Sequence, residues 1–218
     1  MEQKIAPSDI LLFENSDNGD FLQVQNHLRV ILRFIKGLRV YPIPEIAYIP
    51  PDDNLLPEMS LKENLIHQKQ NRFNFFERKG LDDIIEATNN PFVKKLSRQI
   101  QDFDRIAGEC PPCQRKLGSI IKGLLNPAAI VSVVNPNSHL SEKQQEDFFN
   151  ALLYEAQSEE RILILNGIDQ IAWHPHIKKK VKRDSFGQYV IHPYSGAAQK
   201  ELTPFPPLQK VSTKKSAA

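Results

Sequence analysis

The sequence predicts an α/β protein in which a parallel sheet is flanked by helices and carries a helical insertion. Short apolar runs typical of buried strands alternate with segments of helical period, and a long stretch rich in helix signals lies in the middle. With 218 residues, 40% of them hydrophobic, the chain can bury one sizeable core. We expect one domain over residues 1–196, with the insertion at about 60–139, and a flexible tail over 197–218.

The first elements are predicted to be a strand, a loop, a helix and a second strand. SDILLFEN (8–15) has the short apolar run of a buried strand, and the polar NSDNGD after it marks a turn. Apolar residues are dense from 21 to 36, and Gly37 stands where a helix would end. LRVYPIPEIAYI (38–49) is extended by its prolines and β-branched residues.

The middle of the chain carries mainly helix signals. Ser60 and Glu63 fit a capping box, so a helix should begin at that serine. Three further helix-like segments follow, divided by proline or glycine: 80–88, 91–108 and 114–126. AAIVSVV, after them, fits either a strand or the buried end of a helix.

The last third returns to an alternation of helices and strands. Ser141 and Gln144 form a second capping box, which opens a helix in LSEKQQEDFFNALLYEAQ. RILILNG (161–167) has the apolar run of a central parallel strand. WHPHIKKKVKRD (173–184) suggests a short basic helix, and FGQYVIHP (186–193) another strand.

Charge and composition exclude several classes of function. The net charge is +2, from 28 basic and 26 acidic residues, which argues against nucleic acid as a partner; the basic run at 177–183 is interpreted as a solvated helix face. No apolar stretch reaches the roughly 18 to 20 residues of a spanning helix and no signal peptide is visible, so we expect a cytoplasmic protein without a membrane span. Cys110 and Cys113, in CPPC, fit a structural loop, a redox pair or half of a zinc site whose other half is missing, and no metal site is predicted.

The order of these segments resembles the nucleotide-binding domain of ATP-binding cassette (ABC) transporters over residues 9–195. IAYIPPDDNLLPEMSLKENL (46–65) is similar to that family's Q-loop and the helix after it. LSEKQQEDFFNALLYEAQSEERILIL (140–165) is similar to its signature helix running into the Walker B strand. The resemblance implies a P-loop NTPase-like sheet, with an N-terminal antiparallel layer reduced because few residues precede the first strand.

The resemblance also implies that the nucleotide site is degenerate. A P-loop needs glycines whose backbone N–H groups wrap the phosphates, a lysine and a hydroxyl residue. Here these positions hold acids and a phenylalanine, so about four negative charges of a triphosphate would meet repulsion. The Q-loop glutamine becomes proline, the signature glycines become Glu142 and Lys143, and the Walker B acids become asparagine and glycine. The positions aligned with the family's site are Glu14, Gly19, Asp20, Phe21, Pro51, Ser141, Gln144, Asn166, Gly167 and, for the switch histidine, His192.

We therefore predict a non-hydrolysing subunit or adaptor, without a cofactor, that docks on a membrane permease or another complex at the inner face of the membrane. The Q-loop-like segment keeps its partner-facing character better than the site keeps its catalytic residues. Two alternatives stay open: an ATP-binding subunit that dimerises with an active cassette, and an unrelated α/β thiol-based regulator. The predicted partner-binding residues are Asp52, Asp53, Asn54, Leu55, Leu56 and Met59.

Overall fold

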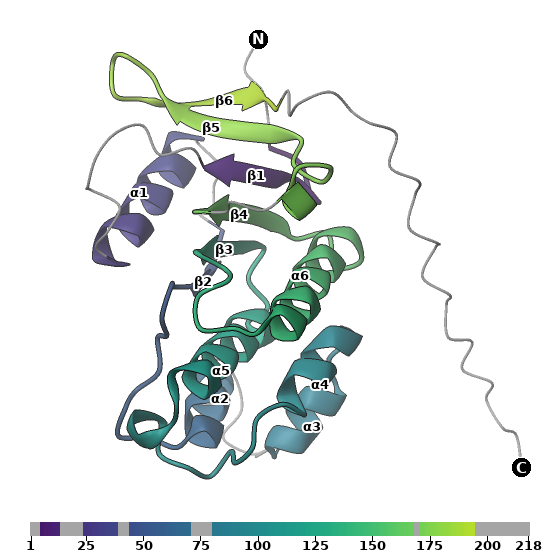
Figure 1. The fold of residues 1–218 in the computed structure, drawn as a ribbon. Coiled ribbons are helices and arrows are strands. Elements are labelled where there is room, and N and C mark those ends of the chain that lie inside the picture. Colours follow the sequence, from purple (N-terminus) through teal and green to yellow (C-terminus); the bar gives the residue numbers. More distant parts are fainter. Residues whose placement is uncertain (1–4, 14–23, 39–43, 71–79, 168–170, 195–218) are drawn as a thin grey trace, which may run out of the picture.

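A mostly parallel sheet with helices on both faces forms the protein (Figure 1). The computed structural model describes residues 5–13, 24–38, 44–70, 80–167 and 171–194. The strands are β1 (Ile10–Phe13), β2 (Ile46–Ile49), β3 (Ile130–Val134), β4 (Ile162–Asn166), β5 (Lys179–Arg183) and β6 (Tyr189–Pro193). The helices are α1 (Val24–Gly37), α2 (Leu61–Gln70), α3 (Leu81–Glu86), α4 (Pro91–Ser97), α5 (Pro112–Leu125) and α6 (Glu142–Gln157), with short 3-10 turns η1 (Ala107–Glu109) and η2 (Ile171–Trp173).

The described strands are ordered β2-β3-β4-β1-β5-β6, and all neighbours are parallel except β5 and β6. This arrangement confirms the predicted α/β class. The segment AAIVSVV, which was open between strand and helix, forms β3 between β2 and β4, and all five residues of β3 are buried. The helical segment therefore ends with α5 at Leu125, and the chain is back in the sheet before residue 139.

The basic run at 177–183 is a strand and not the helix that its lysines suggested. Val181 is fully buried on the face covered by α1, and Lys180 and Lys182 alternate with it. Pairing with β1 on one side and β6 on the other thus overrides the helix preference of lysine. The described antiparallel pairing is this β5–β6 hairpin, late in the chain rather than at its start.

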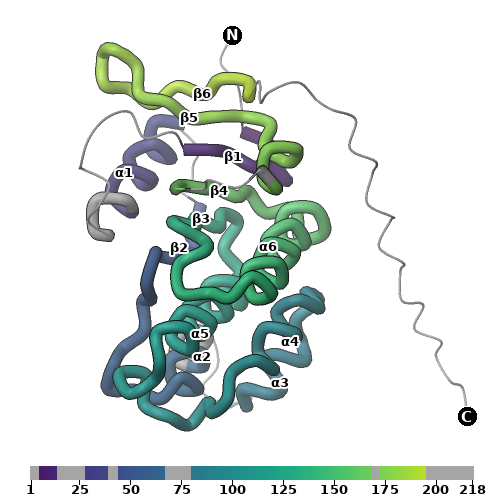
Figure 2. Tube along the Cα trace, in the orientation of Figure 1, coloured from purple at the N-terminus to yellow at the C-terminus, as the bar shows by residue number. Residues whose placement is uncertain are grey.

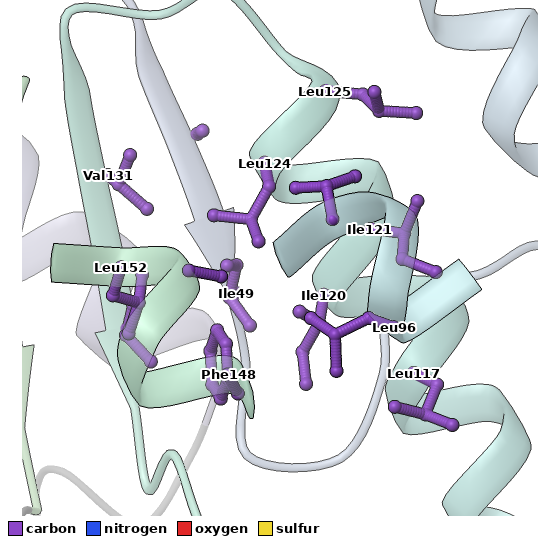
Figure 3. Packing of buried hydrophobic residues seen from close by; sticks show 14 of the residues in the cluster. Ile49, Leu96, Leu117, Ile120, Ile121, Leu124, Leu125, Val131, Phe148 and Leu152 are labelled. Atoms are coloured by element: carbon purple, nitrogen blue, oxygen red, sulfur yellow. The ribbon is translucent and has the colours of Figure 1, made fainter. Parts of the chain in front are cut away.

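Two apolar clusters cover the two faces of the sheet. On one face, α1 contributes Ile31, Phe34 and Ile35, and the Phe34 ring meets the Phe13 ring edge-on with centroids 5.6 Å apart. The opposite face packs against α5 and α6, where Ile49 and Val131 meet Leu124, Phe148 and Leu152 (Figure 3). A Cβ at Gly123 would lie 2.4 Å from Ile49 Cγ1, so glycine allows α5 to approach β2 closely.

Helices α2 to α5 gather at the end of the molecule away from the β5–β6 hairpin (Figure 2). Both predicted capping boxes are present, one at the start of α2 and the other at the start of α6. The Ser60 backbone N–H donates to Glu63 Oε2 at 2.7 Å, and the Ser141 backbone N–H donates to Gln144 Oε1 at 2.9 Å. Within the described part of the chain, none of the helices combines the length and apolar character that crossing a membrane requires.

Candidate functional site

Three parallel strands end in one row, which is where α/β sheets bind ligands. Phe13 of β1 is in register with Asn166 of β4, and Asn166 is in register with Val134 of β3. The loop aligned with the P-loop follows β1 directly and so starts at this edge. Its predicted site residues, Glu14, Gly19, Asp20 and Phe21, lie outside the described residues, and the charge repulsion expected there stays a prediction.

The ends of β3 and β4 are fastened to each other. The Asn135 backbone N–H donates to the Asn166 carbonyl at 2.9 Å, and Asn135 has a positive φ of 44°. Gly167 has a φ of +68°, and a Cβ there would lie 1.8 Å from Asn135 Oδ1. Only glycine fits at 167, because the Asn135 side chain occupies the space beside it.

Two helix–strand units end at this edge, and the sequence left the strand of the second one open. Helix α6 leads into β4, as predicted, but α5 also leads into a buried strand, β3, after a short connection. β3 reaches the edge with Val134 and Asn135, and β4 with Asn166 and Gly167. Neither pair contains a carboxylate, so the lack of Walker B acids stays the prediction whichever of the two strands is aligned with that motif.

Pro51, aligned with the Q-loop glutamine, contributes a backbone carbonyl that is already occupied. Lys116 Nζ donates to the Pro50 and Pro51 carbonyls at 2.5 and 2.8 Å, and the Ser138 hydroxyl also donates to Pro51. The Lys116 side chain is fully buried, and burial lowers its pKa to about 8, an effect opposed by Asp52 and Asp53. Lys116 gave no signal in the sequence, since it lies within an ordinary amphipathic helix.

The acidic turn after Pro51 is held by α5 and by the segment after β3. Arg115 Nε donates to Asp53 Oδ2 at 3.0 Å, and the exposed Asp52 lies 3.2 Å from His139 Nε2. The Ser119 hydroxyl and Lys122 Nζ donate to the side chain and the carbonyl of Asn54, both at 3.0 Å. These contacts fix the shape of the turn before any partner binds.

The apolar residues after this turn divide between core and surface. Leu55 is 9% exposed and packs against α5, with Cδ1 3.3 Å from the position of a Cβ on Gly118, so it is a core residue and not a surface contact. Leu56 is 46% exposed, and Met59 is half-buried. Ile106, 37% exposed and not singled out by the sequence, is bridged to Ser60. Residues 56–60 and 106–108 thus lie side by side and form what we call the apolar patch.

The remaining predicted site residues are dispersed. Ser141 is exposed at the start of α6, and Gln144 uses its amide oxygen to cap that helix. His192 is exposed on β6, opposite Lys180, whose other neighbour is Leu12. His192 is thus level with Leu12, one residue before the end of β1, but β5 lies between β1 and β6. Its alignment with the switch histidine stays a prediction.

The thiols of CPPC are free: Cys110 lies between η1 and α5, and Cys113 lies in the first turn of α5. Cys110 is buried, its Sγ donates to the Ile106 carbonyl at 3.4 Å, and burial is the main cause that raises the pKa of its thiol. A reactive cysteine needs the opposite shift, towards the thiolate. This environment gives the thiol-based alternative no support.

Comparison with solved structures defines the class of fold. An ATP-binding cassette in a dimeric post-hydrolysis state with bound ADP and Pi matches with a TM-score of 0.60 and 12% identity, over 82% of each chain. A metal-chelate-type ABC transporter in an inward-facing conformation matches with a TM-score of 0.58 and 15% identity, over 86% of this chain and 72% of that one. The chain has the fold of an ABC transporter ATP-binding domain.

A curated relative gives the more particular likeness. The chain is 30% identical over 109 residues, 49% of its length, to the ribose import ATP-binding protein RbsA of Oceanobacillus iheyensis. It spans 21% of that relative's length. No protein-family model matches the chain.

Proposed function

We propose that the chain is an ABC-type subunit that has kept the ATP-binding fold without hydrolysing ATP, and that it acts by binding another protein. The observation that carries the proposal is the edge of the sheet where β3 and β4 end. Of the described residues there, Asn135, Asn166 and Gly167 are fastened to one another, and none of these three has a carboxylate that could hold Mg²⁺ or polarise water. Pro51 adds no side-chain donor or acceptor.

Calorimetry with ATP and Mg²⁺ tests the loss of nucleotide chemistry. We expect no binding in the micromolar range and no phosphate release, because the P-loop positions are acidic and the described strand ends supply no metal ligand of high affinity. An active ABC ATPase measured in the same buffer is the control. Micromolar binding or Mg²⁺-dependent turnover by the purified chain would show that the proposal is wrong.

The proposed partner surface is the apolar patch together with the acidic turn. Asn64 holds this segment rigid, since its amide accepts from the Leu56 N–H at 2.7 Å and donates to the Leu56 carbonyl at 3.0 Å. Preorganised segments with exposed apolar residues are suited to binding, because little conformational freedom is lost. The similarity to an import ATP-binding protein and to a transporter chain favours a membrane permease as the proposed partner. With that partner, the subunit would act at the inner face of the membrane.

Substitutions within the patch separate docking from folding. Leu56→Asp should abolish capture of the cognate permease in a pull-down without changing thermal stability, since Leu56 is 46% exposed. Val190→Asp on β6, also at a partly exposed apolar residue, is the matched control and should retain capture. Equal capture of the permease by wild type, Leu56→Asp and Val190→Asp would exclude the apolar patch as the docking surface.

The alternative in which the chain completes the ATP site of an active cassette is less well supported. That role would use Ser141 and Gln144, but Gln144 Oε1 already accepts from the Ser141 N–H. Glu142 and Lys143, both exposed, also replace the small residues that would allow close approach.

A further inference from the structure

The β5–β6 hairpin ends in a turn that is rigidly built. Asp184 Oδ1 accepts from the backbone N–H groups of Phe186 and Gln188 at 2.9 and 2.8 Å. Arg183 Nε donates to the Gly187 carbonyl at 3.1 Å, and Gly187 takes a positive φ of +78° that glycine permits without strain. The turn therefore presents its remaining side chains in a fixed direction.

Phe186 occupies the tip of this turn and is 87% exposed. The other exposed large apolar residues of the described chain, Leu56, Ile106 and Val190, lie between 36% and 46%. The hairpin projects at one end of the molecule, and helices α2, α3, α4 and α5 gather towards the other end (Figure 1). Its tip is therefore remote from the apolar patch. A phenylalanine side chain that a preorganised turn exposes this fully is suited to inserting into an apolar surface outside the protein.

The strand that leads to this tip is strongly basic. Lys178 and Arg183 are exposed, whereas Lys180 and Lys182 are half-buried. Lys179 Nζ forms an ion pair with Asp9 Oδ2 at 2.6 Å, and the Asp184 carboxylate oxygen accepts a hydrogen bond within the turn. Basic residues thus run along β5 from its start to the turn, where Arg183 is the nearest to the apolar tip: they are Lys178, Lys179, Lys180, Lys182 and Arg183.

We propose that this hairpin binds the surface of a lipid bilayer that contains anionic headgroups. Phe186 would enter the boundary between headgroups and acyl chains, and Arg183, beside the turn, would lie among the anionic headgroups. Lys178, at the other end of the strand, would add a weaker attraction, because the attraction falls off within a Debye length. The inference goes beyond the proposed function and does not depend on it, because neither nucleotide nor a permease takes part.

A single-stranded nucleic acid is the other polyanion that combines basic and aromatic contacts, but the geometry is less suitable for it. Stacking platforms present aromatic rings on a surface along which successive bases can lie. On this hairpin the strand aromatic, Tyr189, faces inward, with its ring centroid 5.3 Å from that of Phe13. Only the ring at the loop tip, Phe186, is presented to solvent.

Flotation of the full chain with protein-free vesicles tests the proposal. Wild type should float with vesicles of phosphatidylcholine and phosphatidylglycerol, and should remain at the bottom with phosphatidylcholine alone or in high salt. Phe186→Ser should weaken partition about tenfold or more, since insertion of the ring is lost. Lys178→Glu with Arg183→Glu should weaken binding to anionic vesicles further. Phe186→Trp should give a blue-shifted emission that brominated lipids quench, because the native Trp173 is buried.

Two matched controls keep the test specific. Leu56→Ser removes an exposed apolar side chain from the apolar patch, and Lys143→Glu reverses an exposed charge on α6; both should bind vesicles as wild type does. Circular dichroism melts show that each variant is folded. Wild type that does not float at low salt, Phe186→Ser that floats like wild type, or binding to oligonucleotides but not to vesicles would overturn the proposal. None of these results bears on nucleotide or permease binding.

Discussion

At the scale of single residues, the most consequential one is a lysine that the sequence did not mark. Lys116 joins α5 to the two prolines of the Q-loop-like segment, although burial disfavours its charge. A buried amine on two carbonyls can hold a loop in either protonation state, because a neutral amine still donates. The Pro51 carbonyl is therefore an anchor point for the segment that follows β2.

The pH dependence of stability tests this anchor. In the folded protein the pKa of Lys116 is lowered from its ordinary 10.5 to about 8. Between these values the unfolded chain holds a proton that the folded protein has released, so the contribution of Lys116 to stability rises with pH. The difference in unfolding free energy between wild type and Lys116→Met should grow by about 2 kcal/mol from pH 7 to pH 10. Denaturant titrations at several pH values measure this difference in unfolding free energy. A difference that does not change with pH would contradict the lowered pKa of Lys116 in the folded protein.

At the scale of elements, the junction between β3 and β4 depends on one glycine. Gly167→Ala would place a Cβ against Asn135 Oδ1 and would force alanine to a φ of +68°. We expect a loss of about 2 to 4 kcal/mol in unfolding free energy, from the clash and the backbone strain together. Adding Asn135→Gly should recover part of this loss, since it removes the clashing atom at a residue whose own φ of 44° suits glycine. Urea denaturation measures both, and additive effects of the two changes would contradict the proposed contact.

The same elements show which structure the sequence could predict. Both capping boxes were readable because the interaction is local, from Ser60 to Glu63 and from Ser141 to Gln144. The basic strand β5 was not, because its conformation depends on pairing with β1, far away in the sequence. Leu55 was misplaced on the surface for a related reason: its burial depends on Gly118 of α5, which lies beside it only in the folded chain.

The candidate site was predictable to a similar degree. The composition of the strand ends was visible in the sequence, so the absence of acids at Asn166 and Gly167 could be predicted. That β3 ends at the same edge, and that His192 lies two strands from β1, follow from strand order and register, which periodicity does not specify. The exposed fraction of each side chain in the structure also distinguishes Leu56 from Leu55. The sequence could not do so, because the two are neighbouring leucines.

At the scale of the whole molecule, the two faces of the sheet differ in how much apolar packing covers them. One face is covered in the described structure by α1 alone, through Ile31, Phe34 and Ile35. The other carries α5 and α6, and α5 also packs against α2 and α4, so opening it would expose most of the larger cluster (Figure 3). Local unfolding follows such differences in buried apolar contact. We therefore expect α1 to open without the rest of the fold, and α5 to open only with it.

Native-state hydrogen exchange distinguishes these two modes of opening. Amides of α1 should exchange at a lower free energy than those of α5, which should match the global unfolding free energy from denaturant. Phe34→Ala should lower protection most strongly in α1. Leu117→Ala, a truncation at an equally buried site in α5, should lower protection in α5 by its full effect on global stability, about 2 to 5 kcal/mol. Equal effects of Phe34→Ala on both helices would show that the two layers unfold as one unit, and exchange of α5 before α1 would contradict the expected order of opening. The segment after β2 should share the stability of α5 and the larger core rather than that of α1, since Lys116, Arg115 and Ser119 hold it to α5.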